Sequence, residues 1–145
     1  MEHYSSNELK RFNYLFGETE SVYHEVSLKL GLSDSAMKIL YVLCDNEESC
    51  PLQTICRYSG LSKQTVNSAI RKLENEGILY LENAGKKTKN ACLTDFGKSF
   101  ARKTALRIIE MENSIFSSWA KEDVAAYLKL TEQFLNDLRK KTEEL

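Results

Sequence analysis

The chain has 145 residues, of which 42% are hydrophobic and 28% charged, and its formal net charge is −1 at pH 7. This length suffices for one domain with a hydrophobic core, while the near-neutral charge excludes a uniformly basic, histone-like DNA-binding protein. A single proline and six glycines leave little room for disordered linkers or a fold of many strands.

The first third of the chain predicts two helices. Residues 5–30 carry apolar side chains at mixed three- and four-residue spacing, and Gly31 closes this helix. Ser33 is the expected N-cap of a second helix over residues 34–46. The stripe of the first helix is Leu9, Phe12, Phe16, Thr19, Val22 or Tyr23, Val26 and Leu30, and one side of the second holds Met37, Leu40, Tyr41 and Cys44.

Residues 51–77 predict a helix-turn-helix. Pro51 starts a short helix with apolar Leu52, Ile55 and Cys56 on one face, and a turn containing Gly60 leads to Ser62 as the next N-cap. Two short helices joined by a glycine-containing turn are typical of this motif.

The second of these helices, residues 62–77, carries two opposite stripes. Its apolar stripe is Val66, Ala69, Ile70 and Leu73, and its polar stripe is Gln64, Asn67, Ser68 and Arg71. Arginine pairs with guanine and asparagine or glutamine with adenine in the major groove, so this segment is interpreted as a DNA-reading helix. The alternative interpretation is an ordinary surface helix with a solvated face.

A β-hairpin with a basic tip follows the predicted reading helix. Gly77 ends the helix, residues 78–81 and 91–93 predict two strands, and the turn between them carries Lys86, Lys87 and Lys89. Residues 57–90 hold seven Lys and Arg against three Glu, a net +4, whereas residues 1–56 hold four basic against nine acidic residues, a net −5. The central module is therefore the part suited to a polyanion.

The last third of the chain predicts two more helices. Thr94 caps a single long helix that carries Phe96, Phe100, Ile108, Met111 and Ile115, and a final helix from about Lys121 carries Val124, Leu128, Thr131, Leu135 and Leu138. The apolar stripes of the terminal helices exceed what one small lobe can cover, so we expect them to pack against each other and against a second chain. A dimer with two reading helices suits a palindromic site.

Nearly the whole chain resembles a MarR-type transcriptional regulator. The most specific pieces are GLSKQTVNSAIRKLENEGIL at residues 60–79 and LTDFG at residues 93–97. The resemblance implies a mainly α (α+β) winged helix-turn-helix with a two-stranded β wing. Residues 1–145 would form a single domain, with the DNA-binding lobe at 33–94 and dimerisation helices at 1–31 and 95–145.

The resemblance also implies a homodimer on a pseudo-palindromic promoter site, more often a repressor than an activator, released by a small ligand, a metal or an oxidant. One departure concerns the wing, where the family usually has an acidic residue followed by arginines and this hairpin has lysines only. Lysine suits a narrow minor groove less well than arginine, so we expect the wing to hold phosphates rather than read sequence.

Two sets of candidate site residues follow. An effector pocket between the first two helices and the dimer partner would use Phe12, Phe16, Met37 and Tyr41, for which ordinary core packing is the alternative. The predicted DNA-binding residues are Ser62, Lys63, Gln64, Thr65, Asn67, Ser68, Arg71, Lys86, Lys87 and Lys89.

The cysteine pattern predicts reduced thiols and no metal site. Cys44, Cys56 and Cys92 are expected in the core. Cys50 stands beside Pro51 in a polar loop, so it is the thiol that we expect to be exposed and the candidate for a redox role.

No phosphate loop, zinc-protease motif or nucleophile elbow supports catalysis, and we expect neither an enzyme nor a cofactor. His3 and His24 are the only histidines, and His24 is expected as a packed or surface residue. The alternative function is a winged-helix module that binds proteins without reading DNA. The chain has no apolar run of membrane-spanning length and no targeting pattern at its N-terminus, so we expect a cytoplasmic protein.

Overall fold

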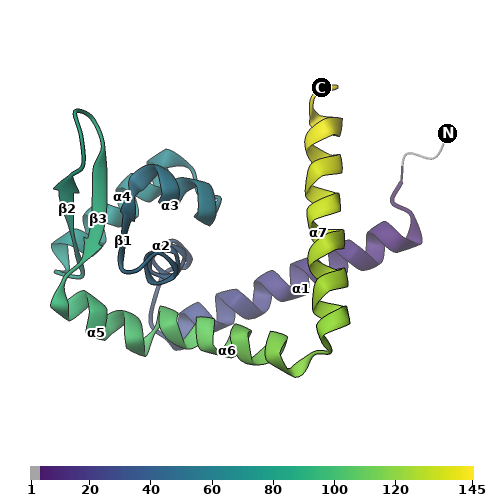
Figure 1. Cartoon of the computed structure of the whole chain (residues 1–145), viewed down its shortest axis with the longest axis horizontal. Coiled ribbons are helices and arrows are strands. Elements are labelled where there is room, and N and C mark those ends of the chain that lie inside the picture. Colours follow the sequence, from purple (N-terminus) through teal and green to yellow (C-terminus); the bar gives the residue numbers. More distant parts are fainter. Residues whose placement is uncertain (1–3) are drawn as a thin grey trace. The chain divides into compact units, whose positions relative to one another are not determined.

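The computed structural model describes residues 4–145, which form seven helices and three strands. The chain divides into two compact units, Met1–Arg107 and Ile108–Leu145. In chain order the elements are α1 (Asn7–Lys29), α2 (Asp34–Asp45), β1 (Ser49–Pro51), α3 (Leu52–Ser59), α4 (Lys63–Asn75), β2 (Leu79–Asn83), β3 (Lys89–Leu93), α5 (Asp95–Lys103), α6 (Ala105–Ser118) and α7 (Lys121–Thr142) (Figure 1). The fold is mainly helical with a small β-sheet, as the sequence predicts.

Hydroxyl side chains begin four of the helices, because each satisfies a backbone N–H that has no partner inside the first turn. The predicted caps Ser33, Ser62 and Thr94 are confirmed, with N–H to Oγ distances of 3.1, 3.1 and 2.9 Å, and Ser6 caps α1 in the same way. Gly77, at a φ of +75°, ends α4 as predicted. The N–H of Ile78 then donates to the carbonyl of Leu73 at 3.0 Å.

The sheet has the strand order β1-β3-β2, and both pairs are antiparallel. The hairpin of β2 and β3 is the predicted wing, with Leu79 paired to Leu93 and Asn83 to Lys89. The sequence predicts two strands only, whereas β1 adds a third along the other edge of β3. Three residues that end in proline have no strand periodicity, so only their pairing with β3 makes them a strand.

The core of the first unit lies around α2, which contacts α3, α4, α5 and the sheet. Buried side chains lie on more than the single side that the sequence predicts, because partners surround this helix. The fully buried larger side chains of the unit up to residue 107 are Ile39, Leu40, Leu43, Ile55, Val66, Ile70, Ile78 and Leu79.

The single long helix predicted after Thr94 is wrong, since the chain forms two helices, α5 and α6, with a break at Thr104. Thr104 has φ −127° and ψ −94°, outside the helical region. Its backbone N–H donates to Ala101 at 3.2 Å and its hydroxyl to the Phe100 carbonyl at 2.9 Å, so the buried break keeps its polar groups paired. Residues 98–118 contain no glycine or proline that would predict this break.

The second unit contains most of α6 and all of α7, and an aromatic cluster packs at the turn between these helices. The ring of Trp119 lies 5.4 Å from that of Phe116 and 5.6 Å from that of Tyr127, both edge to face. Such pairs stabilise the turn beyond the area that they bury. The final helix begins at Lys121, as predicted.

Apolar side chains remain exposed on the terminal helices. In α1 the only buried residue is Ser27, and α7 has none. Among the described residues, no helix is both long and apolar enough to cross a membrane. The exposed large apolar side chains on the predicted stripes include Leu9, Phe12, Phe16, Val22 and Tyr23 of α1 and Leu128, Leu135 and Leu138 of α7.

Candidate nucleic-acid interface

Helix α4 has one buried and one exposed face. Val66, Ile70 and Leu73 are at most 2% exposed and anchor the helix on the core of the first unit. Gln64 and Arg71, about two turns apart on the opposite side, are exposed. The predicted amphipathic division of this helix is therefore confirmed.

The exposed face of α4 forms an open concavity of about 500 Å³, lined by Lys63, Gln64, Asn67, Ser68 and Arg71. Across residues 4–145, no hydrogen bond or ion pair engages the side chains of these five residues. Their amide, hydroxyl, ammonium and guanidinium groups are consequently available to a ligand. Together they offer donors and acceptors, but no carboxylate that would repel an anion.

Ser62 and Thr65, two other predicted DNA-binding residues, are engaged with each other. The Ser62 hydroxyl accepts from the backbone N–H of Thr65 at 3.1 Å and donates to the Thr65 hydroxyl oxygen at 2.9 Å. Ser62 thus uses its hydrogen-bonding capacity at the start of α4. Thr65 still has its own hydroxyl proton to donate.

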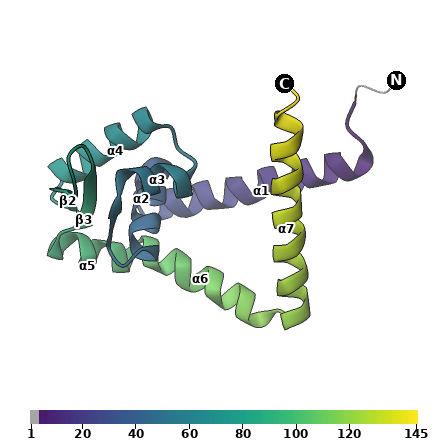
Figure 2. The ribbon, with the colours of Figure 1, turned by 45° about the horizontal axis from the view of Figure 1, so that its top comes forward.

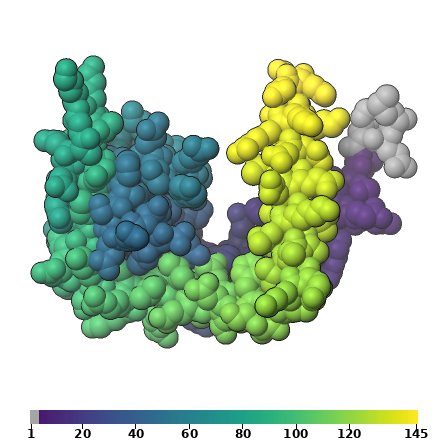
Figure 3. Space-filling view, in the orientation of Figure 1, coloured from purple at the N-terminus to yellow at the C-terminus, as the bar shows by residue number. Residues whose placement is uncertain are grey.

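The wing supplies a second set of cations in the first unit. Lys86 and Lys87 lie in the turn between β2 and β3, whereas Lys89 is already the first residue of β3, and all three are exposed. The N–H of Ala84 donates to the carbonyl of Thr88 at 3.0 Å and closes the turn. Figure 3 shows the hairpin tip standing out from the rest of the first unit, where lysine side chains are accessible to phosphates.

The predicted effector residues do not meet within one chain. Phe12 and Phe16 pack on each other, with ring centroids 5.9 Å apart, on the N-terminal half of α1. Figures 1 and 2 show this half of α1 extending away from α2. Met37 is buried in the core and Tyr41 is half-buried, both on α2. A pocket that joins all four residues would need the second chain, and it stays a prediction.

The predicted exposure of Cys50 is wrong. Strand β1 pairs Cys50 with Ala91, and the side chain is only 4% exposed. Burial raises the pKa of the Cys50 thiol to about 11, with a smaller contribution from nearby Cys92. The reactive thiolate is therefore scarce at neutral pH.

The other cysteines are also free thiols. Cys92 is buried, as expected of a core residue, whereas Cys44 and Cys56 are only half-buried. The pKa of the Cys44 thiol is raised to about 11, mainly by burial. The negative charges of Glu48 and Asp45 also raise this pKa. Cys44 therefore lacks the electropositive, exposed setting of a reactive cysteine.

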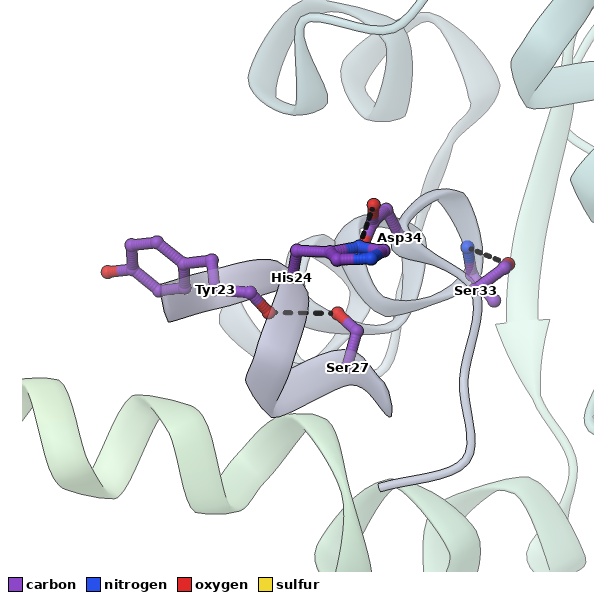
Figure 4. Close-up of polar contacts among 6 residues, drawn as sticks. Tyr23, His24, Ser27, Ser33 and Asp34 are labelled. Atoms are coloured by element: carbon purple, nitrogen blue, oxygen red, sulfur yellow. Dashed lines mark hydrogen bonds and ion pairs between the residues drawn. The ribbon is translucent and has the colours of Figure 1, made fainter. Parts of the chain in front are cut away.

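His24 is an exposed residue, as expected, with a partner that the sequence did not indicate. Its Nδ1 lies 2.8 Å from Oδ2 of Asp34, so the pair links α1 to the first residue of α2 (Figure 4). Nearby in α1, the Ser27 hydroxyl donates to the Tyr23 carbonyl at 3.2 Å. His3 lies outside the described residues, and within residues 4–145 no cluster of three or more His, Cys, Asp or Glu side chains is arranged to hold a metal ion.

The short helices α3 and α4, the polar face of α4 and the basic hairpin define a winged helix-turn-helix protein. Residues 30–87 match the model of the MarR family. Beyond this matched segment, the chain as a whole has the fold of MarR family transcriptional regulators.

Solved structures share this fold at low sequence identity. A MarR family regulator from Neisseria meningitidis has a TM-score of 0.83 and 18% identity over 96% of this chain and 99% of its own. A MarR family regulator from Streptomyces coelicolor, solved in complex with DNA, has a TM-score of 0.71 and 16% identity over 94% and 92%. BpsR from Bordetella bronchiseptica, whose DNA binding is regulated by 6-hydroxynicotinic acid, has a TM-score of 0.63 and 15% identity over 86% and 98%. No curated protein matches the sequence significantly.

Proposed function

We propose that this protein is a DNA-binding transcriptional regulator that reads duplex DNA with the exposed face of α4. The observation that carries the proposal is the concavity lined by five unengaged polar side chains on that face. Arg71 suits guanine, and Gln64 and Asn67 suit adenine, in the major groove. The Streptomyces coelicolor regulator that was solved in complex with DNA shares this fold, which supports DNA as the ligand.

The wing lysines and Lys63 would bind phosphates. Residues 57–90 carry a net charge of +4 in a chain that is otherwise acidic, so a polyanion is attracted to this module. Thr65 would add a hydroxyl donor at the start of α4, and Ser62 would hold the helix start in place. In this proposal the lobe at residues 33–94 binds DNA, and residues 1–31 and 95–145 serve dimerisation.

The dimer is proposed from two exposed stripes, each with regular spacing. On α1, Leu9, Phe12 and Phe16 follow one another at intervals of three and four residues, and on α7, Leu128 and Leu135 are one heptad apart. This spacing places apolar side chains along one side of a helix, where a second chain would bury them. A two-fold dimer presents two α4 helices and suits a pseudo-palindromic site.

We propose that the regulator acts as a repressor and that a small ligand releases it from DNA. BpsR, a protein of the same fold, has its DNA binding regulated by 6-hydroxynicotinic acid. A ligand site formed by Phe12, Phe16, Met37 and Tyr41 with the partner chain fits the exposure of the two phenylalanines. Release by oxidation of Cys50 is disfavoured, because the thiol is buried and its pKa is raised.

The second candidate function is a winged-helix module that binds proteins without reading DNA. A protein-docking surface is typically centred on a buried aromatic or aliphatic anchor. The exposed face of α4 presents amide, hydroxyl and cationic groups in place of such an anchor. This chemistry favours DNA.

Fluorescence anisotropy with the full-length protein and an operator selected from a random duplex pool tests the proposal. Asn67→Ala and Arg71→Ala should each cost about 1–3 kcal/mol of binding free energy and relax sequence preference. The control is Arg102→Ala, which removes an exposed arginine from α5 and should leave operator affinity nearly unchanged. Unchanged affinity and specificity in both α4 variants would show that the reading surface lies elsewhere.

A further inference from the structure

We infer that each α4 reads a half-site of only about three to four base pairs, with adenines opposite Gln64 and Asn67 and a guanine opposite Arg71, and that the flanking DNA under the wing is bound without base reading. This half-site rests on the proposed DNA-binding function. The spacing and chemistry of the side chains on α4 and on the wing determine what the DNA sequence must contain.

The length of the half-site follows from the geometry of α4. Gln64 and Arg71 are seven residues apart, which corresponds to about 10.5 Å along a helix axis. Successive base pairs rise by about 3.4 Å, so this distance covers about three base-pair steps when α4 lies along the row of base edges in the major groove. The concavity ends at Arg71. Exposed Lys72 follows with a cation suited to a phosphate, and beyond it Glu74 and Glu76 expose carboxylates that phosphates would repel. The reading face therefore has little room to extend.

The order of bases follows from the order of side chains. Gln64 and Asn67 are separated by one helical turn and both offer an amide, the group that pairs with N6 and N7 of adenine. Arg71 is one turn further and offers a guanidinium, which pairs with O6 and N7 of guanine. Ser68 lies between them with a short hydroxyl that accepts or donates to either kind of base. We expect the position opposite Ser68 to be the least selective one.

The flanks should carry little sequence information, because the wing lacks the side chain that reads a narrow minor groove. No arginine occurs between Arg71 and Arg102, so every cation of the hairpin is a lysine. Lysine binds phosphate as a hydrated point charge and fits a narrow groove less well than a guanidinium. Lys86, Lys87 and Lys89 would therefore strengthen binding to all sequences alike.

The test uses the full-length protein, a site selected from random duplexes, and the same duplex carrying a single 7-deazaguanine or 7-deazaadenine. These analogues remove the N7 acceptor while leaving Watson–Crick pairing intact. At the guanine opposite Arg71 the analogue should weaken wild-type binding about 10-fold, and it should cause little further loss in Arg71→Ala. At an adenine opposite Asn67, the same coupling should hold for Asn67→Ala. Arg102→Ala should respond to both analogues as the wild type does.

The outcomes separate the half-site assignment from the proposed function. One outcome is that the protein binds a selected operator while the guanine analogue weakens binding by Arg71→Ala as much as it weakens binding by the wild type. That result overturns the half-site assignment but leaves the proposed DNA binding intact. The selected sites could instead require defined bases well beyond four consecutive pairs per half. If that additional preference disappears when all three wing lysines are changed to alanine, the claim that the wing binds its DNA without base reading is overturned. A protein that binds no duplex overturns the proposed function and the half-site together.

Discussion

Gly97, in the first turn of α5, has no space for a larger side chain. A Cβ atom built at this position would lie 1.8 Å from the carbonyl oxygen of Ile78, a backbone atom that cannot turn away. Thr94 connects the same two segments, the end of α4 and the start of α5. Its hydroxyl donates to the Gly77 carbonyl at 2.6 Å and accepts from the Gly97 N–H at 2.9 Å. The close approach holds the start of α5 against the turn that connects α4 to the wing.

Gly97→Ala should therefore destabilise the fold, although alanine is the better helix former. Separation of α5 from Ile78 should lower the free energy of unfolding by about 1–3 kcal/mol or more, measured by urea denaturation. Gly17→Ala is the matched control, since a Cβ there meets no atom within 4 Å in the interior of α1. That variant should gain about 0.5–1 kcal/mol from helix propensity. Equal effects of the two substitutions would contradict the close packing.

Ser62 offers a test of whether a residue serves the helix or the DNA. Ser62→Ala removes the N-cap and should lower the free energy of unfolding by about 0.5–2 kcal/mol. Ser62→Asp restores a good cap but places a negative charge where phosphates are expected, so stability should return while DNA affinity falls. Urea denaturation and fluorescence anisotropy separate the two effects. Loss of affinity in Ser62→Ala without loss of stability would instead identify Ser62 as a DNA-contacting residue.

At the scale of elements, the wing combines a firm base with an exposed tip. Leu79, Ala91 and Leu93 are buried at the base of the hairpin, and β1 pairs along the other edge of β3. The turn beyond Asn83 carries Lys86 and Lys87, which no ion pair within residues 4–145 engages. The base can thus hold the tip in place while the lysines remain free for phosphates.

Changing Lys86, Lys87 and Lys89 together to alanine should weaken binding to operator and to random duplex alike. The slope of log K against log salt should flatten by about 0.9 for each phosphate that the variant no longer neutralises. Anisotropy titrations at several salt concentrations measure both quantities, and the matched triple change to arginine should preserve the slope. A triple alanine variant that failed to bind operator but kept its affinity for random DNA would show that the wing reads sequence.

At the scale of the whole molecule, α1 in the first unit and α7 in the second each carry a stripe of exposed apolar side chains. Each stripe holds large side chains that are about half exposed, such as Phe16 at 56% on α1 and Leu138 at 50% on α7. We expect a partner to bind where large apolar side chains stay exposed at regular spacing along a helix. The proposed dimer would cover both stripes with a second copy.

Leu135→Glu with Leu138→Glu should convert the proposed dimer to monomers or aggregates and greatly reduce operator affinity. Burial of two carboxylates in the proposed apolar interface would cost on the order of several kcal/mol. Sedimentation velocity at micromolar concentration measures the state, and Lys129→Glu, which changes an exposed charge on α7, is the control. A wild-type chain that is monomeric under these conditions would contradict the dimer and the palindromic site.

The sequence by itself determined the features that depend on neighbouring residues. Ser33, Ser62 and Thr94 were predictable as helix starts, because a cap bonds to a backbone group only two or three residues away. The spacing of Val66, Ile70 and Leu73 likewise determined which face of α4 is buried and which polar side chains line its exposed face. Most of the fold and the exposed polar face of α4 could therefore be predicted from local patterns.

Only the tertiary structure decided features that depend on partners distant in the chain. Strand β1 exists because it pairs with β3, about 40 residues later, and that pairing buries Cys50, which its polar surroundings in the sequence had suggested to be exposed. The break at Thr104 occurs at a buried residue in a stretch without glycine or proline, so its sequence resembles an unbroken helix. For β1 and Cys50 the deciding interactions form only when the whole unit folds, and a local pattern of residues does not encode them.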